Sequence, residues 1–514
     1  NSTGAKIYLD QSKCVETDYA GVRDDAYWSA FVTNKPKVYY QAVEVPTYVN
    51  YHGEEIIPVV PIIPQDVTTA EELEEALASD NGSIRLMANI TLDRTLYITK
   101  NTTIFGVSPY TITRAAGFAG DLFVVGQYAN GDLCEAGVTL TLGREDGTAT
   151  DHLIIDGNKD NLTVDVVGSA LFVCNGATVN LTKEVTLQNH KKVGNDRTSH
   201  ENVTVSYPVK VGGSAVIVAS GGTLNIYGST IRNNEVNTVS DGTDAGVQGG
   251  AIYNYGTTNV YGGLFEGNTA YFGGAIFNYR RLNIYNATIQ NNPSTDLGGA
   301  IYMPNSTAAV TNIGTANDVV EPNVVFSGNY GGDDGGAIYA RNVLNIENTL
   351  FENNSSKGYG GAIIAQSMRV TLKNVIFRGN SSTATVGGAI YMTGSNNKEQ
   401  LELTAENVTF ENNSGTNGGA LYLSNNTRAY IKNASFTGNT AGNGGAIYLK
   451  GSHLEMDGAT FDSNAATTKA GGIYAVQNEL DDGTIITSTL VLNKIEATGN
   501  SATDCGFAYL TYTD

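Results

Sequence analysis

The sequence Gly249-Gly250-Ala251-Ile252-Tyr253 decides the fold, because the same five-residue phrase returns throughout the second half of the chain. Close copies begin at Gly273, Gly298, Gly335, Gly360, Gly387, Gly418 and Gly444, and weaker copies begin at Ala470 and Cys505. Successive copies are separated by roughly 24 to 37 residues, a period typical of solenoids and repeat arrays. A repeat of this kind constrains the architecture before any single residue is considered.

A second phrase, Phe-x-x-Asn, precedes most of these copies. It begins at Phe265, Phe326, Phe351, Phe377, Phe410, Phe436 and Phe461, with aliphatic versions at Ile231 and Ile289. Runs such as Leu224–Tyr227 and Leu282–Tyr285 alternate apolar and polar residues, as strands with one buried face do. We therefore predict three short strands per repeat, one coil per repeat, and coils stacked at ~4.8 Å as a parallel β-helix.

Alternation also predicts which side chains face inward. Ile252 and its equivalents should line the core, and the aromatic residue beside each should point outward, since adjacent strand residues face opposite sides. This outward column comprises Tyr253, Phe277, Tyr302, Tyr339, Tyr391, Tyr422, Tyr448 and Tyr474. It is our candidate binding strip for sugar rings or a partner protein. The structural alternative is β-propensity and cross-strand packing under a loop.

The remaining letters of both phrases have structural interpretations. The paired glycines suit tight turns that require positive φ. The asparagine of Phe-x-x-Asn tolerates the left-handed region, and in stacked coils its amide would form a ladder that satisfies turn carbonyls.

Composition narrows the classes of function. The chain of 514 residues has a formal net charge of -21, which disfavours nucleic acid and anionic membranes as partners. No apolar run approaches the ~20 residues of a membrane span, so no direct membrane insertion is expected. The polar sequence from Asn1 shows no signal peptide, so we expect cleaved targeting segments or a longer parent chain.

Cysteines and glycosylation sequons leave alternatives open. Cys14, Cys134, Cys174 and Cys505 lack metal-ligand spacing. Cys134 and Cys174 could pair or remain buried thiols, whereas Cys14 and Cys505 would pair only between successive molecules. Asn-x-Ser/Thr sequons occur at Asn89, Asn101, Asn161, Asn180, Asn286, Asn354, Asn407 and Asn433. Composition explains most of them, and a glycoprotein remains an open interpretation.

Three segments are expected along the chain. Residues 1–64 form an N-terminal arm or small β segment with a Pro-rich linker. Residues 65–248 form a capping helix at 66–77, with Thr68 or Thr69 as its cap, followed by irregular β-helix coils. Residues 249–514 form the regular coils. Because a solenoid needs a polar terminal cap, the core-like strand at 507–510 suggests more polypeptide or a partner at that end.

Two resemblances follow from these motifs. Residues 66–156, with the Glu-rich helix, Ile104-Phe105-Gly106 and Leu153–Gly157, resemble the N-terminal coils of right-handed β-helix proteins of the pectate-lyase type. Residues 249–475, with repeated Gly-Gly-Ala-Ile and Phe-x-x-Asn, resemble chlamydial polymorphic outer-membrane proteins and similar adhesin-like repeats. The second resemblance implies a secreted or surface-displayed adhesive passenger. Chains of that family end in a translocating outer-membrane barrel, which we do not expect within these residues.

The candidate catalytic carboxylates are the acidic pairs Asp241/Asp244, Asp333/Asp334 and Asp481/Asp482. A hydrolase needs two carboxylates about 5 to 9.5 Å apart, and a lyase of this shape needs Ca²⁺ ligands with a basic residue. All three pairs lie in turn-like sequence, where Asp is common. The histidines His52, His152, His190, His200 and His453 are scattered. We therefore expect no catalytic residues, no metal site and no cofactor.

The sequence as a whole predicts an all-β, right-handed parallel β-helix at the cell surface or outside the cell, acting as an adhesin-like or structural protein. Its expected partners are glycans or proteins of host or neighbouring cells, or copies of itself. The alternatives are a subunit of a self-assembling filament or sheath, and a polysaccharide lyase or hydrolase.

Overall fold

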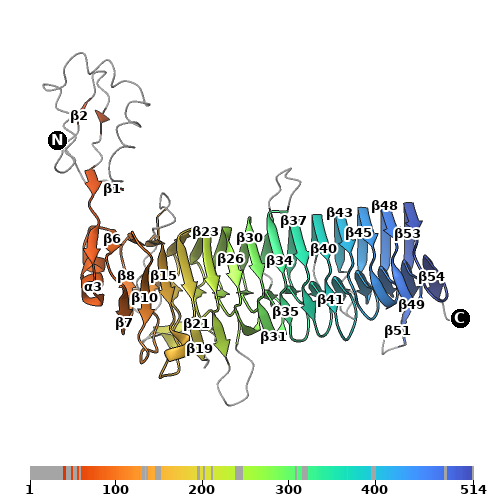
Figure 1. The fold of residues 1–514 in the computed structure, drawn as a ribbon, viewed down its shortest axis with the longest axis horizontal. Helices are drawn as coiled ribbons and strands as arrows, with labels where there is room; N and C mark the ends of the chain where they lie inside the picture. Colours follow the sequence, from red (N-terminus) through yellow and green to blue (C-terminus); the bar gives the residue numbers. More distant parts are fainter. Residues whose placement is uncertain are drawn as a thin grey trace.

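The protein is an elongated rod of stacked β coils (Figure 1). This computed structural model describes residues 63–126, 137–144, 152–193, 212–237, 247–306, 309–314, 322–366, 369–394, 401–479 and 483–511. Eight further strands are described by their backbone alone: β1 (Tyr39–Gln41), β2 (Tyr48–Val49), β3 (Glu55–Ile56), β4 (Val60–Ile62), β12 (Tyr128–Ala129), β13 (Leu133–Cys134), β20 (Arg197–His200) and β21 (Val203–Val209).

One long side of the rod is a 14-stranded parallel sheet, here called the short-strand sheet. From the first coil to the last its strands are β8 (Leu96–Ile98), β11 (Phe123–Val125), β16 (Leu171–Val173), β22 (Val216–Val218), β25 (Ile252–Asn254), β28 (Ile276–Asn278), β32 (Ile301–Met303), β36 (Ile338–Ala340), β39 (Ile363–Gln366), β42 (Ile390–Thr393), β44 (Leu421–Ser424), β47 (Ile447–Lys450), β50 (Ile473–Val476) and β54 (Ala508–Thr511). The register places Ile252 on Ile276 and Ile276 on Ile301. The repeated phrase therefore forms this sheet, one copy per rung.

The second side is a 21-stranded sheet, here called the long-strand sheet. Its strands are β5 (Gln65–Val67), β6 (Ser83–Leu86), β7 (Ile90–Leu92), β9 (Thr102–Gly106), β10 (Tyr110–Arg114), β14 (Thr139–Leu142), β15 (Leu153–Asp156), β17 (Thr178–Thr182), β18 (Val185–Gln188), β23 (Thr223–Arg232), β26 (Thr257–Glu266), β29 (Arg281–Ile284), β30 (Ala287–Gln290), β33 (Val310–Ile313), β34 (Val324–Ser327), β37 (Val343–Glu352), β40 (Val370–Arg378), β43 (Glu402–Glu411), β45 (Arg428–Thr437), β48 (His453–Asp462) and β53 (Thr489–Thr498).

In many coils two of the predicted strands merge into one. The alternating run and the start of Phe-x-x-Asn form continuous strands of nine or ten residues in β37, β40, β43 and β45. Each bends at an asparagine with positive φ, namely Asn348, Asn374, Asn407 and Asn433. Asparagine tolerates this conformation better than other side chains, so a single residue turns the corner without ending the ladder.

Short strands after each Phe-x-x-Asn complete the coil. Five of them form a third sheet: β27 (Ala270–Phe272), β31 (Pro293–Leu297), β35 (Tyr330–Gly331), β38 (Ser355–Ser356) and β41 (Ser381–Ser382). Three smaller pairs are β19 (Lys191–Val193) with β24 (Glu235–Asn237), β46 (Thr440–Asn443) with β49 (Ala465–Lys469), and the antiparallel β51 (Asn478–Glu479) with β52 (Ile485–Ile486). A 3₁₀ turn, η1, spans Lys159–Asn161.

The core is continuous along the described rod and consists of columns of like residues. The isoleucine of each phrase and the residue two positions later are buried, as predicted. Phe326, Phe351, Phe377, Phe410, Phe436 and Phe461 form a second column. Their ring centroids lie 4.7 to 5.1 Å apart with nearly parallel planes. Parallel in-register strands place identical side chains directly above one another, so stacking is the packing available to the phenylalanines.

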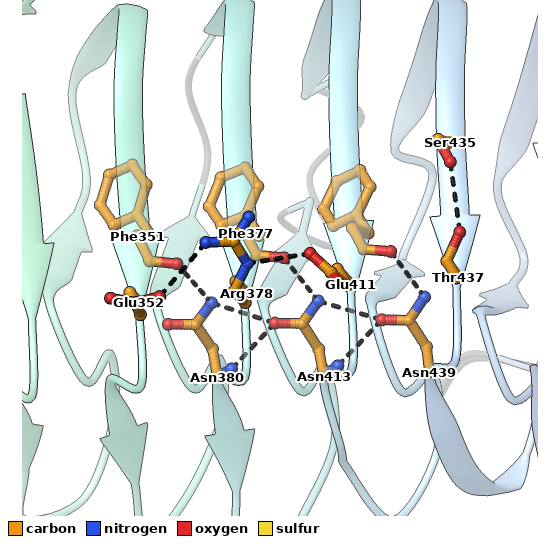
Figure 2. Close-up of polar contacts among 11 residues, drawn as sticks. Phe351, Glu352, Phe377, Arg378, Asn380, Glu411, Asn413, Ser435, Thr437 and Asn439 are labelled. Atoms are coloured by element: carbon orange, nitrogen blue, oxygen red, sulfur yellow. Dashed lines mark hydrogen bonds and ion pairs between the residues drawn. The ribbon is translucent and has the colours of Figure 1, made fainter. Parts of the chain in front are cut away.

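The asparagines of Phe-x-x-Asn form the predicted amide ladder, which we call the buried asparagine ladder (Figure 2). Asn380 Nδ2 donates to Asn413 Oδ1 at 3.0 Å and to the Phe351 carbonyl at 2.9 Å. The Asn380 backbone N–H also donates to Asn413 Oδ1, at 2.9 Å. The pattern repeats through Asn234, Asn268, Asn292, Asn329, Asn354, Asn413, Asn439 and Asn464. The ladder satisfies buried polar groups that would otherwise cost free energy.

Helix α3 (Ala70–Ala78) lies at the N-terminal end of the rod (Figure 1) and is the only α-helix among the described residues. It begins later than predicted, because Asp66 and Val67 belong to β5 and pair with β6. Thr69 is the cap and accepts from the Glu72 N–H at 3.2 Å, and Glu72 in turn accepts from the Thr68 N–H. Leu73 and Leu77 are buried in the core, so the helix covers the first coils.

Both large sheets run without interruption across residue 248. Val216 of β22 pairs with Ile252 of β25, and Thr223 of β23 pairs with Thr257 of β26. The irregular and regular coils therefore share one core, and they differ in the length of their connections.

Candidate functional site

The aromatic column predicted from the repeated phrase is covered, which corrects the expectation that it faces solvent. Its side chains do point away from the core isoleucines, but Tyr253 is only 1% exposed and Tyr339 only 2%. Phe277, Tyr302 and Tyr474 are also buried, and Tyr391, Tyr422 and Tyr448 are half-buried. We call these residues the covered tyrosine column.

Two features explain the burial. The rings stack on one another, with centroids 4.8 Å apart for Tyr253–Phe277 and 4.7 Å for Tyr422–Tyr448. Two of the segments that precede a glycine pair also contribute rings, because Phe272 stacks on Tyr302 at 4.9 Å and Tyr359 stacks on Tyr391 at 4.7 Å. The chain therefore folds back over the column before it enters the next rung, as the structural alternative proposed.

The glycine pairs permit this close approach. A Cβ on Gly250 would lie 2.2 Å from the Gly274 carbonyl oxygen, and one on Gly249 would lie 2.1 Å from the Ile252 carbonyl oxygen. Gly249 also has a φ of +64°, which favours glycine. Burial raises the pKa of Tyr339 and that of Tyr448 to about 12. The covered tyrosines are thus held neutral as core residues.

The acidic pairs give no catalytic geometry in the part of the chain that is described. Asp241/Asp244 and Asp481/Asp482 lie outside the described residues. Asp334 is buried in a turn, where Oδ1 accepts from the Tyr359 N–H at 2.8 Å. Burial raises its pKa to about 6. Over the described residues, no group of three His, Cys, Asp or Glu side chains could hold a metal ion.

The described histidines have local partners. His152 Nε2 lies 2.8 Å from Thr186 Oγ1, and His453 Nδ1 lies 2.6 Å from Thr489 Oγ1. His190 is fully buried at the first position of the buried asparagine ladder, where Nε2 contacts the Ile155 carbonyl at 3.1 Å. Burial lowers its pKa to about 3. His52 and His200 lie outside the residues whose side chains are described.

The structure places some of the cysteines and most of the sequon asparagines. Cys174 is buried, the Cys134 side chain and Cys14 lie outside the description, and Cys505 Sγ donates to the Ala508 carbonyl. Disulfide pairing therefore stays a prediction. Asn354 belongs to the buried ladder, so its sequon is inaccessible in the fold. Exposed sequon asparagines are Asn89, Asn101, Asn161, Asn286, Asn407 and Asn433.

A second aromatic set, not singled out from the sequence, lies on the outer face of the long-strand sheet. Tyr227 and Tyr261 are 42% and 43% exposed, and Tyr285 is half-buried. Their centroids are 4.9 Å apart for Tyr227–Tyr261 and 5.1 Å for Tyr261–Tyr285, with interplanar angles of 7° and 9°. We call these three residues the exposed tyrosine stack.

The pairing of β23 with β26 is irregular at the middle ring. Val260 pairs with Ile226 and Gly262 with Tyr227, so Tyr261 is skipped in the register, and skipping Gly228 restores it at Ser229–Gly263. Tyr261 itself continues the outward alternation of Thr257 and Asn259. Gly228, with φ +112°, lies at the same corner.

An outer asparagine ladder lies beside the exposed tyrosine stack. It runs through Asn180, Asn225, Asn259, Asn283, Asn312 and Asn345, all half-buried. From Asn225 to Asn345, each Nδ2 donates to the Oδ1 of the preceding rung at 2.8 to 2.9 Å. Asn180 Nδ2 instead donates to Thr141 Oγ1 at 3.3 Å. Tyr227 and Tyr261 are each two residues beyond a ladder asparagine in their own strand, and Tyr285 directly follows the strand of Asn283, so each tyrosine lies on the face of its asparagine. The signal was present in Leu224–Tyr227 and Leu282–Tyr285.

Farther along the rod, the same outer column is charged. Glu347, Lys373, Glu406, Lys432 and Asp457 lie in register on successive rungs and alternate in sign. Lys432 Nζ lies 3.7 Å from Glu406 Oε1. The uncharged tyrosine and asparagine face therefore ends where the charged column begins at Glu347, and we take this face as the candidate site.

A comparison with known protein families finds the same repeats in this chain. The model of the Chlamydia polymorphic membrane protein repeat matches residues 323–341, 348–366, 374–393, 407–424 and 433–450. Each match contains one Phe-x-x-Asn motif and the Gly-Gly-Ala phrase that follows it. The chain thus carries repeats of this type, in the coils of a parallel β-helix, as the sequence predicted.

One curated relative is the probable autotransporter YfaL of Escherichia coli strain K12, which is 38% identical over 117 residues. That stretch covers 20% of this chain and 9% of the autotransporter. The described part of the chain contains no α-helix with the length and hydrophobicity that a membrane span requires.

Solved structures with some likeness include the catalytic domain of a GH87 alpha-1,3-glucanase in complex with nigerose, at a TM-score of 0.38 and 10% identity, covering 88% of this chain and 70% of that one. Another is the Yersinia enterocolitica family 28 exopolygalacturonase, at a TM-score of 0.35 and 12% identity, covering 92% and 89%.

Proposed function

We propose that this chain is a surface-displayed, adhesin-like rod whose binding surface is the exposed tyrosine stack with the outer asparagine ladder. The observation that carries the proposal is the exposure of Tyr227 and Tyr261 on the long-strand sheet. Their rings stack on each other next to the amides of the outer asparagine ladder, and no segment of the described chain buries them. Exposed aromatic residues that keep a polar group are favoured contact residues at recognition surfaces.

The repeats support the display part of the proposal. Chlamydia polymorphic membrane proteins and autotransporters are the named relatives of these coils. A rod with a continuous core holds its outer side chains at fixed spacing, so many weak contacts act together and the overall affinity rises without any strong single contact.

The experiment measures adhesion by the intact chain. Beads coated with the folded protein should be retained on mammalian cells, bacterial cells or polysaccharide-coated glass more strongly than beads carrying the same protein after thermal unfolding. Equal retention of folded and unfolded protein on every surface would contradict an adhesive role.

The two other candidates have their own measurements. A filament or sheath would appear by electron microscopy as end-to-end rods, with reducible ladders on gels if Cys14 and Cys505 join molecules. A polysaccharide lyase or hydrolase would release reducing ends from polygalacturonate or glucans. In the described residues, Asp333/Asp334 is the acidic pair to substitute, and loss of product release in Asp333→Asn would favour the enzyme.

A further inference from the structure

We infer that the outer face around Tyr261 is a binding site for an uncharged polysaccharide lying along the rod. The inference rests on the proposed adhesive function and names the ligand class for that same face. It is built from three successive rungs: β23 contributes Tyr227, β26 contributes Tyr261, and Tyr285 directly follows β29, with an asparagine two residues before each tyrosine.

The asparagines provide unused hydrogen-bonding groups at regular intervals. A carboxamide has two N–H donors and two acceptor lone pairs. In the outer ladder Asn259 donates one N–H to Asn225 and accepts one from Asn283, at 2.9 and 2.8 Å. One donor and one acceptor therefore remain on each half-exposed amide. Sugar hydroxyls both donate and accept, so they complement this pair on every rung.

The ladder also orients these groups before a ligand arrives. Because each amide is fixed by its neighbours above and below, little side-chain freedom is lost on binding, and such pre-organisation favours affinity. The rungs repeat at ~4.8 Å, close to the advance of one sugar unit in an extended glycan. Successive sugars could then meet equivalent amides.

The tyrosines of the exposed stack form the part of the site beside the asparagine ladder. Their rings stack on one another at 4.9 and 5.1 Å, so the faces of the middle ring are occupied. What Tyr261 presents to solvent is its ring edge and phenol group. This surface suits the mixed C–H and hydroxyl surface of a sugar chain. A protein partner would instead be favoured by an apolar cluster with ring faces open for burial.

Charge disfavours acidic glycans on the same face. The outward residues of the first halves of β23 and β26 are Thr223, Asn225 and Tyr227, and Thr257, Asn259 and Tyr261, all uncharged. The cations at its border are Arg280 and Arg281 at the start of the third rung, and Lys183, which lies beside Gly228 and whose Nζ is 3.6 Å from Glu184 Oε1. The net charge of -21 repels a polyanion at long range, and these border cations oppose that repulsion only in part.

Affinity gel electrophoresis of the full chain tests the inference. Native gels contain galactomannan, xyloglucan or mannan as neutral probes and polygalacturonate as the anionic probe. We expect at least one neutral polymer to slow the wild-type protein and polygalacturonate to leave it unchanged. The double variant Tyr227→Ala/Tyr261→Ala keeps the net charge, and its dissociation constant should rise at least tenfold.

Tyr330→Ala is the matched control. Tyr330 is 41% exposed and lies in β35 of the third sheet, away from the proposed face, so its variant should bind like the wild type. Asn259→Ala should also weaken binding, because it interrupts the outer ladder. An unchanged thermal unfolding midpoint in the double variant shows that a loss of binding is not a loss of fold.

Three results would overturn the site: no neutral polymer slows the wild type, the double variant binds as tightly as the wild type, or polygalacturonate binds more tightly than every neutral polymer. If coated beads still adhere to cells in those cases, the adhesive function stands and the ligand assignment fails. If beads do not adhere but a neutral polymer is bound through Tyr261, the site stands and adhesion fails.

Discussion

Tyr253 and Tyr261 are separated by eight positions in the sequence, both belong to stacked aromatic columns, and both point away from the β-helix core. Their surroundings differ completely, since Tyr253 is 1% exposed and Tyr261 is 43% exposed. The difference comes from the connecting segment, which folds back over the short-strand sheet and leaves the outer face of the long-strand sheet open. Direction away from the core and contact with solvent are therefore separate properties in this fold.

The comparison separates residues that stabilise the rod from residues available for recognition. A covered tyrosine contributes buried area and a satisfied hydroxyl, whereas an exposed one contributes little to stability. Substitutions in the two columns should therefore affect different measurements.

The largest effect is expected in the covered column. Tyr339→Ala should lower the free energy of unfolding by about 3 to 5 kcal/mol, because it leaves a cavity beside Tyr302 and deletes a hydrogen bond to Gln366. Denaturant unfolding followed by circular dichroism measures the change. Tyr339→Phe retains the ring and should lose only about 1 kcal/mol. Equal losses in the two variants would show that packing is not the main contribution.

Alkaline pH should act on the same column. The pKa of Tyr339 is about 12 in the fold and about 10 in an unfolded chain. The folded state thus holds its proton more tightly, and stability is complete below pH 10 and falls between pH 10 and 12. The loss is on the order of 3 kcal/mol for this residue. Unfolding midpoints measured across this range should fall less steeply in Tyr339→Phe, and parallel curves would contradict the assignment.

A smaller change is expected beside the covered column, at Asp334. Burial raises its pKa from 3.8 to about 6, so the protonated form is favoured in the fold and stability falls as pH rises from about 4 to 6. Asp334→Asn keeps an acceptor for the Tyr359 N–H and carries no charge. It should raise the free energy of unfolding by about 1 kcal/mol at pH 7 and leave it unchanged at pH 3.5. Asp333→Asn removes an exposed carboxylate whose charge adds to the effect of burial on the pKa of Asp334, so it should raise the free energy of unfolding at pH 7 by less than Asp334→Asn does.

The smallest effect is expected in the exposed stack. Tyr261→Ala should change the free energy of unfolding by less than about 0.5 kcal/mol, because the ring is open to solvent and its stacking partners remain. The same denaturant titration used for Tyr339→Ala measures it. A loss as large as that of Tyr339→Ala would mean that the exposed tyrosine stack belongs to the core, and would remove the basis of the binding site.

The periodicity of the sequence predicts much of the fold. The repeated phrase and alternation predicted parallel coils, the inward isoleucines and the amide ladder of Asn380 and Asn413, because each depends only on local geometry repeated in register. The helix was also predicted, although its start was placed too early, since Asp66 can join a strand whose partner is distant in sequence.

Exposure could not be read in the same way. Whether Tyr253 meets water depends on the path of the segment before Gly249, and the alternating pattern within the strand carries no information on that path. The exposed tyrosine stack was not predicted, because Tyr227, Tyr261 and Tyr285 lie at the ends of alternating runs whose sequence varies from coil to coil. The Gly-Gly-Ala-Ile-Tyr phrase is more regular, and the binding strip was predicted on its tyrosine. Its signal was a tyrosine two residues after an asparagine in three successive coils.

The buried asparagine ladder has a consequence for how such a rod can change its length. Every amide presents the same acceptor to one neighbour and the same donor to the other, as Asn380 does between Asn354 and Asn413. A whole coil can therefore be duplicated or deleted with the joint re-forming unaltered, while a partial one would break it. Recombination that duplicates or deletes whole coils in the gene would change the length of the rod in steps of ~4.8 Å.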